Sequence, residues 1–198
     1  AEHQMTDLSF TGKDLLIDLI NKACSQETLF QTTEILRHGL SDLIANKSVF
    51  LPECVFEPVE GHYARRELYK SPELGVTVVA MTWGPGQGTP IHDHCGLWCV
   101  EGVWQGKIEI TSYELKENDE DKCRFIKHET VLAEAGSAGS LIPPHEYHTI
   151  HNPNPKQAAI SLHIYQGTMG DCSIYEPETD GWYAKGRKML CLDPVDCK

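Results

Sequence analysis

The chain has 198 residues, with 17 lysines and arginines against 29 aspartates and glutamates, which gives a formal net charge of −12. This acidic balance excludes a protein that binds the nucleic-acid phosphate backbone through a basic face. No apolar run is long enough to cross a bilayer, so a membrane-spanning protein is also excluded. A chain of this length can bury enough apolar surface to fold without cross-links, and we expect one domain over residues 1–198.

Residues 1–50 predict a helical layer. Apolar residues recur at helical spacing over 15–23 and again over 29–44. Thr11 and Asp14 resemble a capping box at the start of the first helix, with Asp in place of Glu. We expect the two helices to cover one side of the structure that follows, and we assign them no function.

From residue 74 onward the pattern changes to that of strands. Residues 76–83 alternate with the period of two typical of a half-buried strand, and they end at a Gly-Pro-Gly turn. Similar runs follow at 97–103, 107–115, 124–132, 140–142, 147–151 and 158–165. Many short strands without helices between them predict a sandwich or jelly-roll barrel, with its core over 74–175. The charged segment 114–122 predicts an exposed hairpin tip, whereas the tail from Tyr175 fits a strand or an ordered loop.

Eight cysteines are spread along the chain without a CxxC pair, which argues against a zinc ribbon or a thioredoxin-type redox motif. The first residues, AEHQMTDLSF, have neither the basic nor the apolar region of a secretory signal. Disulfides are typical of secreted proteins. We therefore expect a cytoplasmic protein with reduced thiols.

Ten histidines are unevenly distributed, and two groups stand out. His92 and His94 follow a glycine-rich turn, and residues two apart on a strand share a face, so both imidazoles can point to one site. The second group is His145, His148 and His151. Imidazoles from two separate segments can hold a metal and leave positions open on it, as catalytic sites require. A His-x-His pair alone is as readily a surface feature.

These histidine segments resemble the two motifs of the cupin superfamily. Residues 86–106 resemble the first motif, and residues 143–152 resemble the second, with His145 where the family usually has glycine. The resemblance implies a mainly β, cupin-type double-stranded β-helix with the N-terminal helices packed outside. It also implies three metal ligands: His92, His94 and His148. At odd offsets from the last of these, His145 and His151 would face away from the metal.

Most metal cupins carry a glutamate as a fourth ligand a few residues after the His-x-His pair. Leu97, Trp98 and Cys99 hold that place here, and we expect Glu101 to lie too far along the chain to serve. A three-histidine site without a carboxylate is similar to that of the thiol dioxygenases, the cysteine dioxygenase family. In that family the substrate thiolate supplies the missing anion, and a neutral imidazole cap leaves Fe(II) its full charge to attract it.

Further residues resemble the same family. Ser161, His163 and Tyr165 resemble its Ser-His-Tyr relay, and their spacing places them on one face of a strand. Cys99 stands where the animal-type enzymes form a thioether with the relay tyrosine, provided that a turn or bulge at residues 95–96 brings it inward. The alternative is that the three relay residues are ordinary barrel interior and that Cys99 is a small buried hydrophobe.

Tyr63 and Arg65 resemble the Tyr-x-Arg segment whose arginine binds the substrate carboxylate. A guanidinium suits this role because it offers a permanently charged, two-pronged donor. Arg66 would take the role if the register slipped by one, and Arg65 could instead be a surface charge. Trp83 also fits the family, and Cys172 matches a family cysteine near the pocket, although we assign it no catalytic role.

The resemblance implies an iron enzyme of cysteine catabolism that uses Fe(II) to convert L-cysteine and O₂ to cysteine sulfinic acid. Residues 83–98 look like the bacterial branch, which usually has Gln and Gly in place of Arg65 and Cys99. Because the chain keeps the cysteine-dioxygenase choice at both positions, L-cysteine is favoured, with 3-mercaptopropionate or another small thiol as the alternative. A cupin isomerase or carbon-bond dioxygenase and a non-enzymatic small-molecule-binding cupin are the competing classes. The expected partners are the thiol and O₂, without nucleic acid or membrane, and a monomer is favoured.

Overall fold

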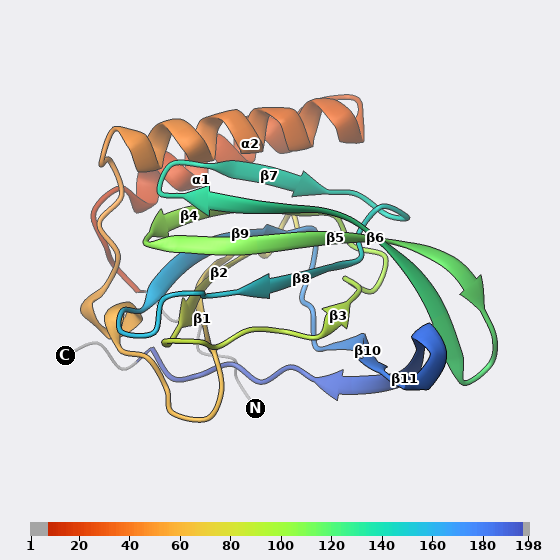
Figure 1. The fold of residues 1–198 in the computed structure, drawn as a ribbon. Coiled ribbons are helices and arrows are strands. Elements are labelled where there is room, and N and C mark those ends of the chain that lie inside the picture. The colour runs from red at the N-terminus through yellow and green to blue at the C-terminus, as the bar shows by residue number, and fades with distance from the viewer. Residues whose placement is uncertain (1–7, 196–198) are drawn as a thin grey trace, which may run out of the picture.

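Two helices, α1 (Lys13–Cys24) and α2 (Leu29–Ala45), lie together on one side of the computed structural model, which describes residues 8–195 (Figure 1). Two short 3₁₀ helices, at Glu53–Phe56 and Thr179–Gly181, precede the first strand and the last strand respectively. Within the described part of the chain, no helix combines the length and the apolar content needed to cross a bilayer.

The start of α1 differs from the prediction. Thr11 and Asp14 do not form a capping box; Gly12 precedes the helix with φ at +89°, and no side chain caps it. Glycine fits this position because it adopts positive φ without steric cost. The capping box forms instead at α2, where the Thr28 side chain accepts from the Gln31 backbone and the Gln31 side chain accepts from the Thr28 backbone.

The strands form two sheets. The first has the order β1 (Ala64–Lys70), β2 (Thr77–Trp83), β9 (Ala159–Tyr165), β4 (Cys99–Gln105) and β7 (Ala138–Leu141). The second pairs in a closed order: β10 (Asp171–Pro177), β11 (Trp182–Met189), β6 (Lys122–Glu134), β5 (Lys107–Asn118), β8 (His148–His151) and β3 (Ile91–His92). All strand pairs are antiparallel. This mainly β, double-stranded β-helix with helices packed outside confirms the predicted fold class.

Each predicted strand run corresponds to an observed strand, with ends shifted by a few residues. The hairpin tip is shorter than predicted, because β5 and β6 run on to Asn118 and Lys122 and leave residues 119–121 between them. The tail contains a strand, β11, which ends at Met189. It and β1 lie outside the predicted core of 74–175, and the division of the chain into domains remains a prediction.

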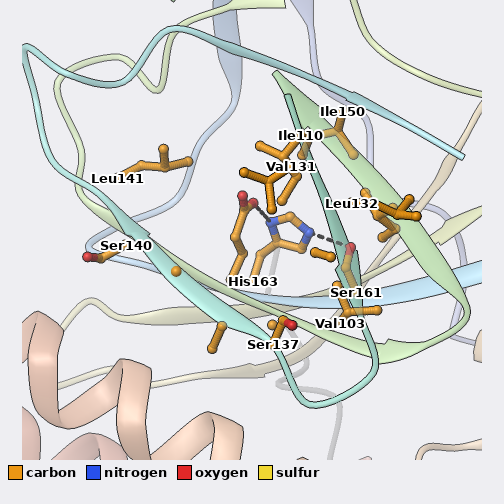
Figure 2. Close-up of a pocket in the computed structure, with 16 residues that line it drawn as sticks. Val103, Ile110, Val131, Leu132, Ser137, Ser140, Leu141, Ile150, Ser161 and His163 are labelled. Atoms are coloured by element: carbon orange, nitrogen blue, oxygen red, sulfur yellow. Dashed lines mark hydrogen bonds and ion pairs between the residues drawn. The ribbon is translucent and has the colours of Figure 1, made fainter. Parts of the chain in front are cut away.

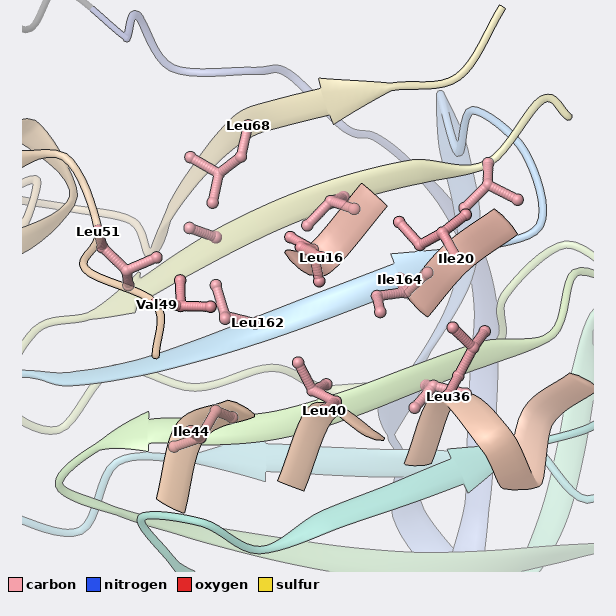
Figure 3. Packing of buried hydrophobic residues seen from close by; sticks show 14 of the residues in the cluster. Leu16, Ile20, Leu36, Leu40, Ile44, Val49, Leu51, Leu68, Leu162 and Ile164 are labelled. Carbon is pink, nitrogen blue, oxygen red and sulfur yellow. The ribbon is translucent and has the colours of Figure 1, made fainter. Parts of the chain in front are cut away.

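Strand β9 connects the helical layer to the barrel interior. Its residues Ile160, Leu162 and Ile164 belong to the apolar cluster beneath the helices, with less than 1% of each side chain exposed. The helices contribute six buried residues to this cluster: Leu16, Ile20, Ala23, Leu36, Leu40 and Ile44. All of them except Ala23 are labelled in Figure 3. Because side chains alternate along a strand, the residues between the three β9 positions face the opposite way, into the barrel.

Candidate metal centre

Three histidines converge inside the barrel. His92 ends β3, His94 follows two residues later, and His148 begins β8 directly opposite His92 in the strand pairing. Their ring centroids are 4.5 to 5.1 Å apart. One donor nitrogen from each ring lies within 4.8 Å of those of the other two, and all three side chains are buried. The structure therefore brings together the three residues that the cupin motifs indicated.

Backbone carbonyls orient two of these rings. Nδ1 of His92 lies 3.1 Å from the Pro90 carbonyl oxygen, and Nδ1 of His148 lies 3.0 Å from that of Glu146. Each of these bonds assigns the proton to Nδ1 and leaves Nε2 as the electron-pair donor. The Glu146 carboxylate also accepts a hydrogen bond from the His94 backbone N–H at 3.2 Å. Glu146 thus ties the two histidine segments together, a role that the sequence did not indicate.

The centre has unsatisfied polar atoms of the kind that a metal would satisfy. His148 Nε2 and His94 Nδ1 are buried without a hydrogen-bond partner. Buried polar atoms are rarely left unpaired, because each one costs free energy. Three imidazole donors suit Fe, Zn, Cu or Ni. The donor set therefore fits a transition metal, including iron, without distinguishing among these ions.

The three imidazoles are held in the form that binds metal. Burial and the neighbouring His148 lower the pKa of His92 to about 3. The pKa of His94 is well below its ordinary value and that of His148 is also lowered, in both cases mainly through burial. Because protonated imidazole has no electron pair to donate, these shifts keep the site ready for a cation at neutral pH.

Glu101 lies closer to the imidazoles than its position along the chain suggested, although it is not part of their ligand group. Glu101 pairs directly with His163 across β4 and β9, and its buried carboxylate points into the barrel. Its Oε1 lies 4.0 Å from His148 Nε2, and its Oε2 lies 3.1 Å from His163 Nδ1. Burial works to raise the pKa of this carboxyl, but His163 and the nearby imidazoles lower it to about 2. A carboxylate therefore adjoins the three imidazoles, although its donor atoms group with Cys99 and His163.

The register of β4 explains this difference. The chain turns at Cys95 and Gly96, which have φ of +53° and +75°. This is the turn that the sequence required to bring Cys99 inward. Cys99 then pairs with Tyr165 across the two strands, and the next residue on the same face is Glu101. Counting positions along the chain does not show which side chains face inward after such a turn.

In the predicted Ser-His-Tyr relay, His163 faces Ser161 on one side and Glu101, instead of Tyr165, on the other. Trp83 Nε1 donates to Ser161 Oγ at 2.9 Å. Ser161 Oγ in turn lies 2.6 Å from His163 Nε2, as Figure 2 shows. Since the indole N–H can only donate, the Ser161 hydroxyl can give its proton to Nε2, which leaves Nδ1–H of His163 facing Glu101. Among the described residues no hydrogen bond joins His163 to Tyr165; their rings stack with centroids 6.0 Å apart.

Tyr165 and Cys99 are fully buried neighbours in neutral form. Burial is the main cause that raises the pKa of each well above its ordinary value. Hydrogen bonding from Tyr165 and the charge of Arg65 both work against this shift at Cys99. The thiol and the phenol therefore face each other as uncharged groups at neutral pH.

The two candidate arginines of β1 have opposite surroundings. The Arg66 guanidinium contacts the Val55 and Glu57 carbonyls and the Thr82 hydroxyl, away from the metal centre. Arg65 lines the small cavity, about 20 Å³, that contains the imidazoles, and its buried Nε has no hydrogen-bond partner. A slipped register is therefore excluded, because only Arg65 faces the imidazoles.

Tyr63 and Lys188 complete this side of the cavity. The Tyr63 ring stacks on Trp83 with centroids 4.6 Å apart, and Lys188 Nζ lies 3.3 Å from the Tyr63 hydroxyl. The sequence did not indicate Lys188, because its strand in the tail had no clear pattern.

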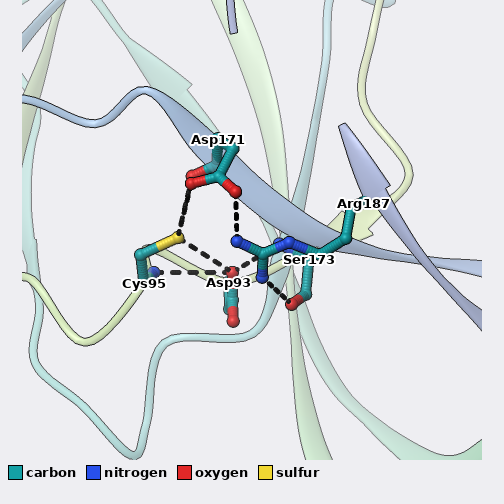
Figure 4. Close-up of polar contacts among 5 residues, drawn as sticks. All are labelled: Asp93, Cys95, Asp171, Ser173 and Arg187. Atoms are coloured by element: carbon teal, nitrogen blue, oxygen red, sulfur yellow. Dashed lines mark hydrogen bonds and ion pairs between the residues drawn. The ribbon is translucent and has the colours of Figure 1, made fainter. Parts of the chain in front are cut away.

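Residues beside the ligands hold the loop in place. Asp93 turns away from the imidazoles, and its carboxylate accepts from the Ser173 backbone N–H at 2.8 Å, which attaches the loop to β10 (Figure 4). Arg187 contacts the Asp171 carboxylate next to it. His145 and His151 are exposed and lie outside the cluster, as expected from their spacing.

The described residues include both free and disulfide-bonded cysteines. Free thiols are found at Cys24, Cys95, Cys99, Cys123, Cys172 and Cys191. Cys54 is disulfide-bonded, so the expectation of reduced thiols is wrong there. Sequence spacing does not show which sulfurs lie close enough in space to pair. Cys172 lines the metal cavity, and burial raises its pKa to about 11.

Comparisons with known proteins agree with this geometry. Residues 61–178 match the family model described as cysteine dioxygenase type I. Cysteine dioxygenase type 1 of Homo sapiens is 28% identical over 105 residues, and that of Rattus norvegicus is 24% identical over 102 residues. Each alignment covers 52% of this chain and 50% of the relative, so the chain spans about half the length of the curated relatives it matches.

Two solved structures are similar to the chain. A conserved Klebsiella pneumoniae protein with a double-stranded β-helix domain has a TM-score of 0.49 at 18% identity, covering 66% of this chain and 93% of its own. Oxalate oxidase in complex with glycolate has a TM-score of 0.43 at 19% identity, covering 57% of this chain and 55% of its own.

Proposed function

Because the chain belongs to the cysteine dioxygenase type I family, we propose that it is an iron-dependent thiol dioxygenase that converts L-cysteine and O₂ to cysteine sulfinic acid. The observation that carries the proposal is the meeting of His92, His94 and His148 in one small buried cavity with Arg65. Three neutral donors bind a cation, and the guanidinium adds a site for an anion beside it.

The ligands in this proposal are His92, His94 and His148. A bound Fe(II) would lower the pKa of the substrate thiol and supply the redox chemistry that activates O₂. Arg65 binds and orients the substrate carboxylate through a charge-assisted hydrogen bond, for which its buried, unpartnered Nε is available. Tyr63, stacked on Trp83, limits the space beside this carboxylate.

Tyr165 and its neighbours orient the substrate and handle protons. Its hydroxyl, neutral at physiological pH, donates a hydrogen bond toward the carboxylate or the oxygen that is being transferred. Ser161 and His163 fix the strand face from which Tyr165 projects, and the Glu101 carboxylate lies 3.1 Å from His163 Nδ1. The buried setting excludes water, which strengthens each of these contacts.

The proposal includes a thioether between Cys99 and Tyr165. The bond would join the sulfur to a ring carbon, with loss of one hydrogen from each group and reduction of O₂ by these two electrons and two protons. Direct pairing of the two residues across β4 and β9 supports it. Intact mass and a peptide map after turnover test the bond: a loss of two hydrogen atoms is expected, and an unchanged mass would contradict it.

L-cysteine is the proposed substrate, and 3-mercaptopropionate is the alternative. Arg65 and Lys188 on one side of the cavity support a substrate with a carboxylate. A role in cysteine catabolism, a cytoplasmic location, a monomeric state and a single domain over residues 1–198 accompany the proposal.

An oxygen-electrode assay of iron-reconstituted protein tests the function. Cysteine, 3-mercaptopropionate and cysteamine form the panel, since cysteamine lacks the carboxylate. We expect the highest kcat/KM with cysteine and the lowest with cysteamine. Iron-loaded protein that consumes no O₂ with any thiol would overturn the proposal in favour of a binding protein or another cupin chemistry.

A further inference from the structure

A second cavity lies beside the metal cavity. It has a volume of about 270 Å³ and is lined by residues of β4, β5, β6, β7, β8 and β9 (Figure 2). Most of its lining side chains are apolar, among them Val103, Ile108, Ile110, Leu132, Leu141 and Ile150. Val131 and Leu132 are 47% and 49% exposed, so the cavity is accessible from solvent on the side of β6.

One layer of side chains separates this apolar cavity from the metal cavity. Glu101, Ile150 and His163 line both of them. The polar groups of this layer contact one another: His163 lies between Ser161 and Glu101. The wall therefore presents a mostly apolar cavity on one side and the imidazoles on the other, and its unpartnered polar atoms, Glu101 Oε2 and His163 Nδ1, are buried and face each other.

The opposite side of the metal cavity has the contrary character. A cavity of about 280 Å³ there includes His62, Tyr63, Arg65 and Lys188 in its lining, and it shares Tyr63 and Arg65 with the metal cavity. Two of these residues, Arg65 and Lys188, have basic side chains, within a chain whose net charge is −12. An anionic substrate is attracted to this side and not to the apolar one.

The thiol substrate and O₂ differ from each other in the same way as these two cavities. The thiol carries a carboxylate, whereas O₂ is small, uncharged and apolar. Cavities lined by apolar side chains bind small apolar molecules, including xenon. We infer that the apolar cavity is the site where O₂ collects and from which it passes Glu101, Ile150 and His163 to the metal, while the thiol arrives past Arg65. This inference rests on the proposed function.

Gly139 offers a direct way to fill the cavity. It lies on β7 directly opposite Glu101, so a side chain at this position would point to the same face as that carboxylate. A Cβ added there meets nothing within 4 Å, and φ is not in the left-handed region. Gly139→Phe should therefore occupy the cavity without a backbone clash, and Gly139→Ala is the matched control that leaves most of the volume.

Xenon binding tests the cavity without any reaction. We expect xenon to give saturable NMR shifts of the Val103, Ile110 and Ile150 methyl groups in metal-free protein. These shifts should persist in Gly139→Ala and disappear in Gly139→Phe. Absence of xenon shifts in the unsubstituted protein would overturn the inference. Val131→Trp, at the exposed lip, provides a second filling variant should Gly139→Phe not fold.

Kinetics test the route. With thiol saturating, we expect Gly139→Phe or Val131→Trp to raise the KM for O₂ at least tenfold, with kcat at saturating O₂ and the KM for thiol changed less than twofold. An unchanged KM for O₂ in a filled variant that no longer binds xenon would overturn the route. Failure of the proposed function is distinguished from both results, because the unsubstituted iron-loaded protein would then consume no O₂ with any thiol.

Discussion

The two sheets contribute different parts of the site. The three imidazoles come from β3, β8 and the loop between β3 and β4, which belong to or adjoin the second sheet. The groups that surround them come from the first sheet: Arg65, Trp83, Cys99, Glu101, Ser161, His163 and Tyr165. Every residue of β2 and β9 is buried, whereas much of β6 is exposed.

The two sets of residues are held in place in different ways. Groups of the first sheet are fixed by strands that are covered on both faces. The ligands stand on short strands and a loop, and they depend on local bonds from Pro90, Glu146 and Asp93 instead. We therefore expect ligand substitutions to remove the metal without unfolding the barrel, and substitutions under the helices to do the opposite.

The largest effect is expected from His92→Ala. Loss of one of three donors should lower the affinity for Fe(II) by more than about a hundredfold, since even residues that only support a ligand contribute tenfold to a hundredfold. Metal content and thiol-dependent O₂ uptake should both be lost, and circular dichroism should be unchanged. The control is His151→Ala, which removes an exposed imidazole nearby. Full iron binding by His92→Ala would contradict the ligand assignment.

Leu40→Ala tests the helix-covered sheet. The Leu40 side chain is fully buried against β4 and β9, so its truncation should lower the free energy of unfolding by about 2–5 kcal/mol. Urea denaturation measures this loss, and Leu15→Ala, at a half-exposed position of α1, is the control. We expect the folded fraction to bind iron normally. A stability equal to that of the control would show that the helices do not support the sheet.

Arg65→Gln tests the substrate contact from the first sheet. A charge-assisted hydrogen bond contributes about 1.5–3 kcal/mol, which corresponds to a loss of roughly tenfold to a hundredfold in kcat/KM for cysteine. Iron content should stay the same, because Arg65 is not a ligand in this proposal. Turnover of cysteamine, which has no carboxylate, should change little. Equal losses of turnover and of iron would mean that Arg65 is structural.

The last prediction concerns the pH dependence of the stability of the metal-free protein, which does not involve turnover. The pKa of His92 is lowered from 6.5 to about 3 in the folded state, so the unfolded state binds more protons between these values. Stability should therefore fall as the pH is lowered from 6.5 toward 3, by at most about 1.4 kcal/mol per pH unit for this residue. Denaturation curves of the protein and of His92→Gln at several pH values measure it. Parallel pH profiles would contradict the assignment.

The sequence predicted the fold class, the strands of the barrel core and the ligand segments, because period-two patterns and motif spacing are local properties. It did not predict Glu101, whose direction depends on the turn at Cys95 and on the pairing of β4 with β9. Lys188 was missed for a similar reason, since only the pairing of β11 brings it to Tyr63. Contacts between distant strands depend on register, which one sequence does not state.

The position of β9 between the helical layer and the site affects how catalytic turnover responds to heating. Its odd-numbered interior residues, Ser161, His163 and Tyr165, stand on the same backbone as the residues that pack beneath α1 and α2. Loosening of the helices on warming would shift that backbone and misalign the phenol and imidazole while all three ligands stay in position. We therefore expect catalytic turnover to decline at a lower temperature than iron release, with the helical layer as the first part of the molecule to fail.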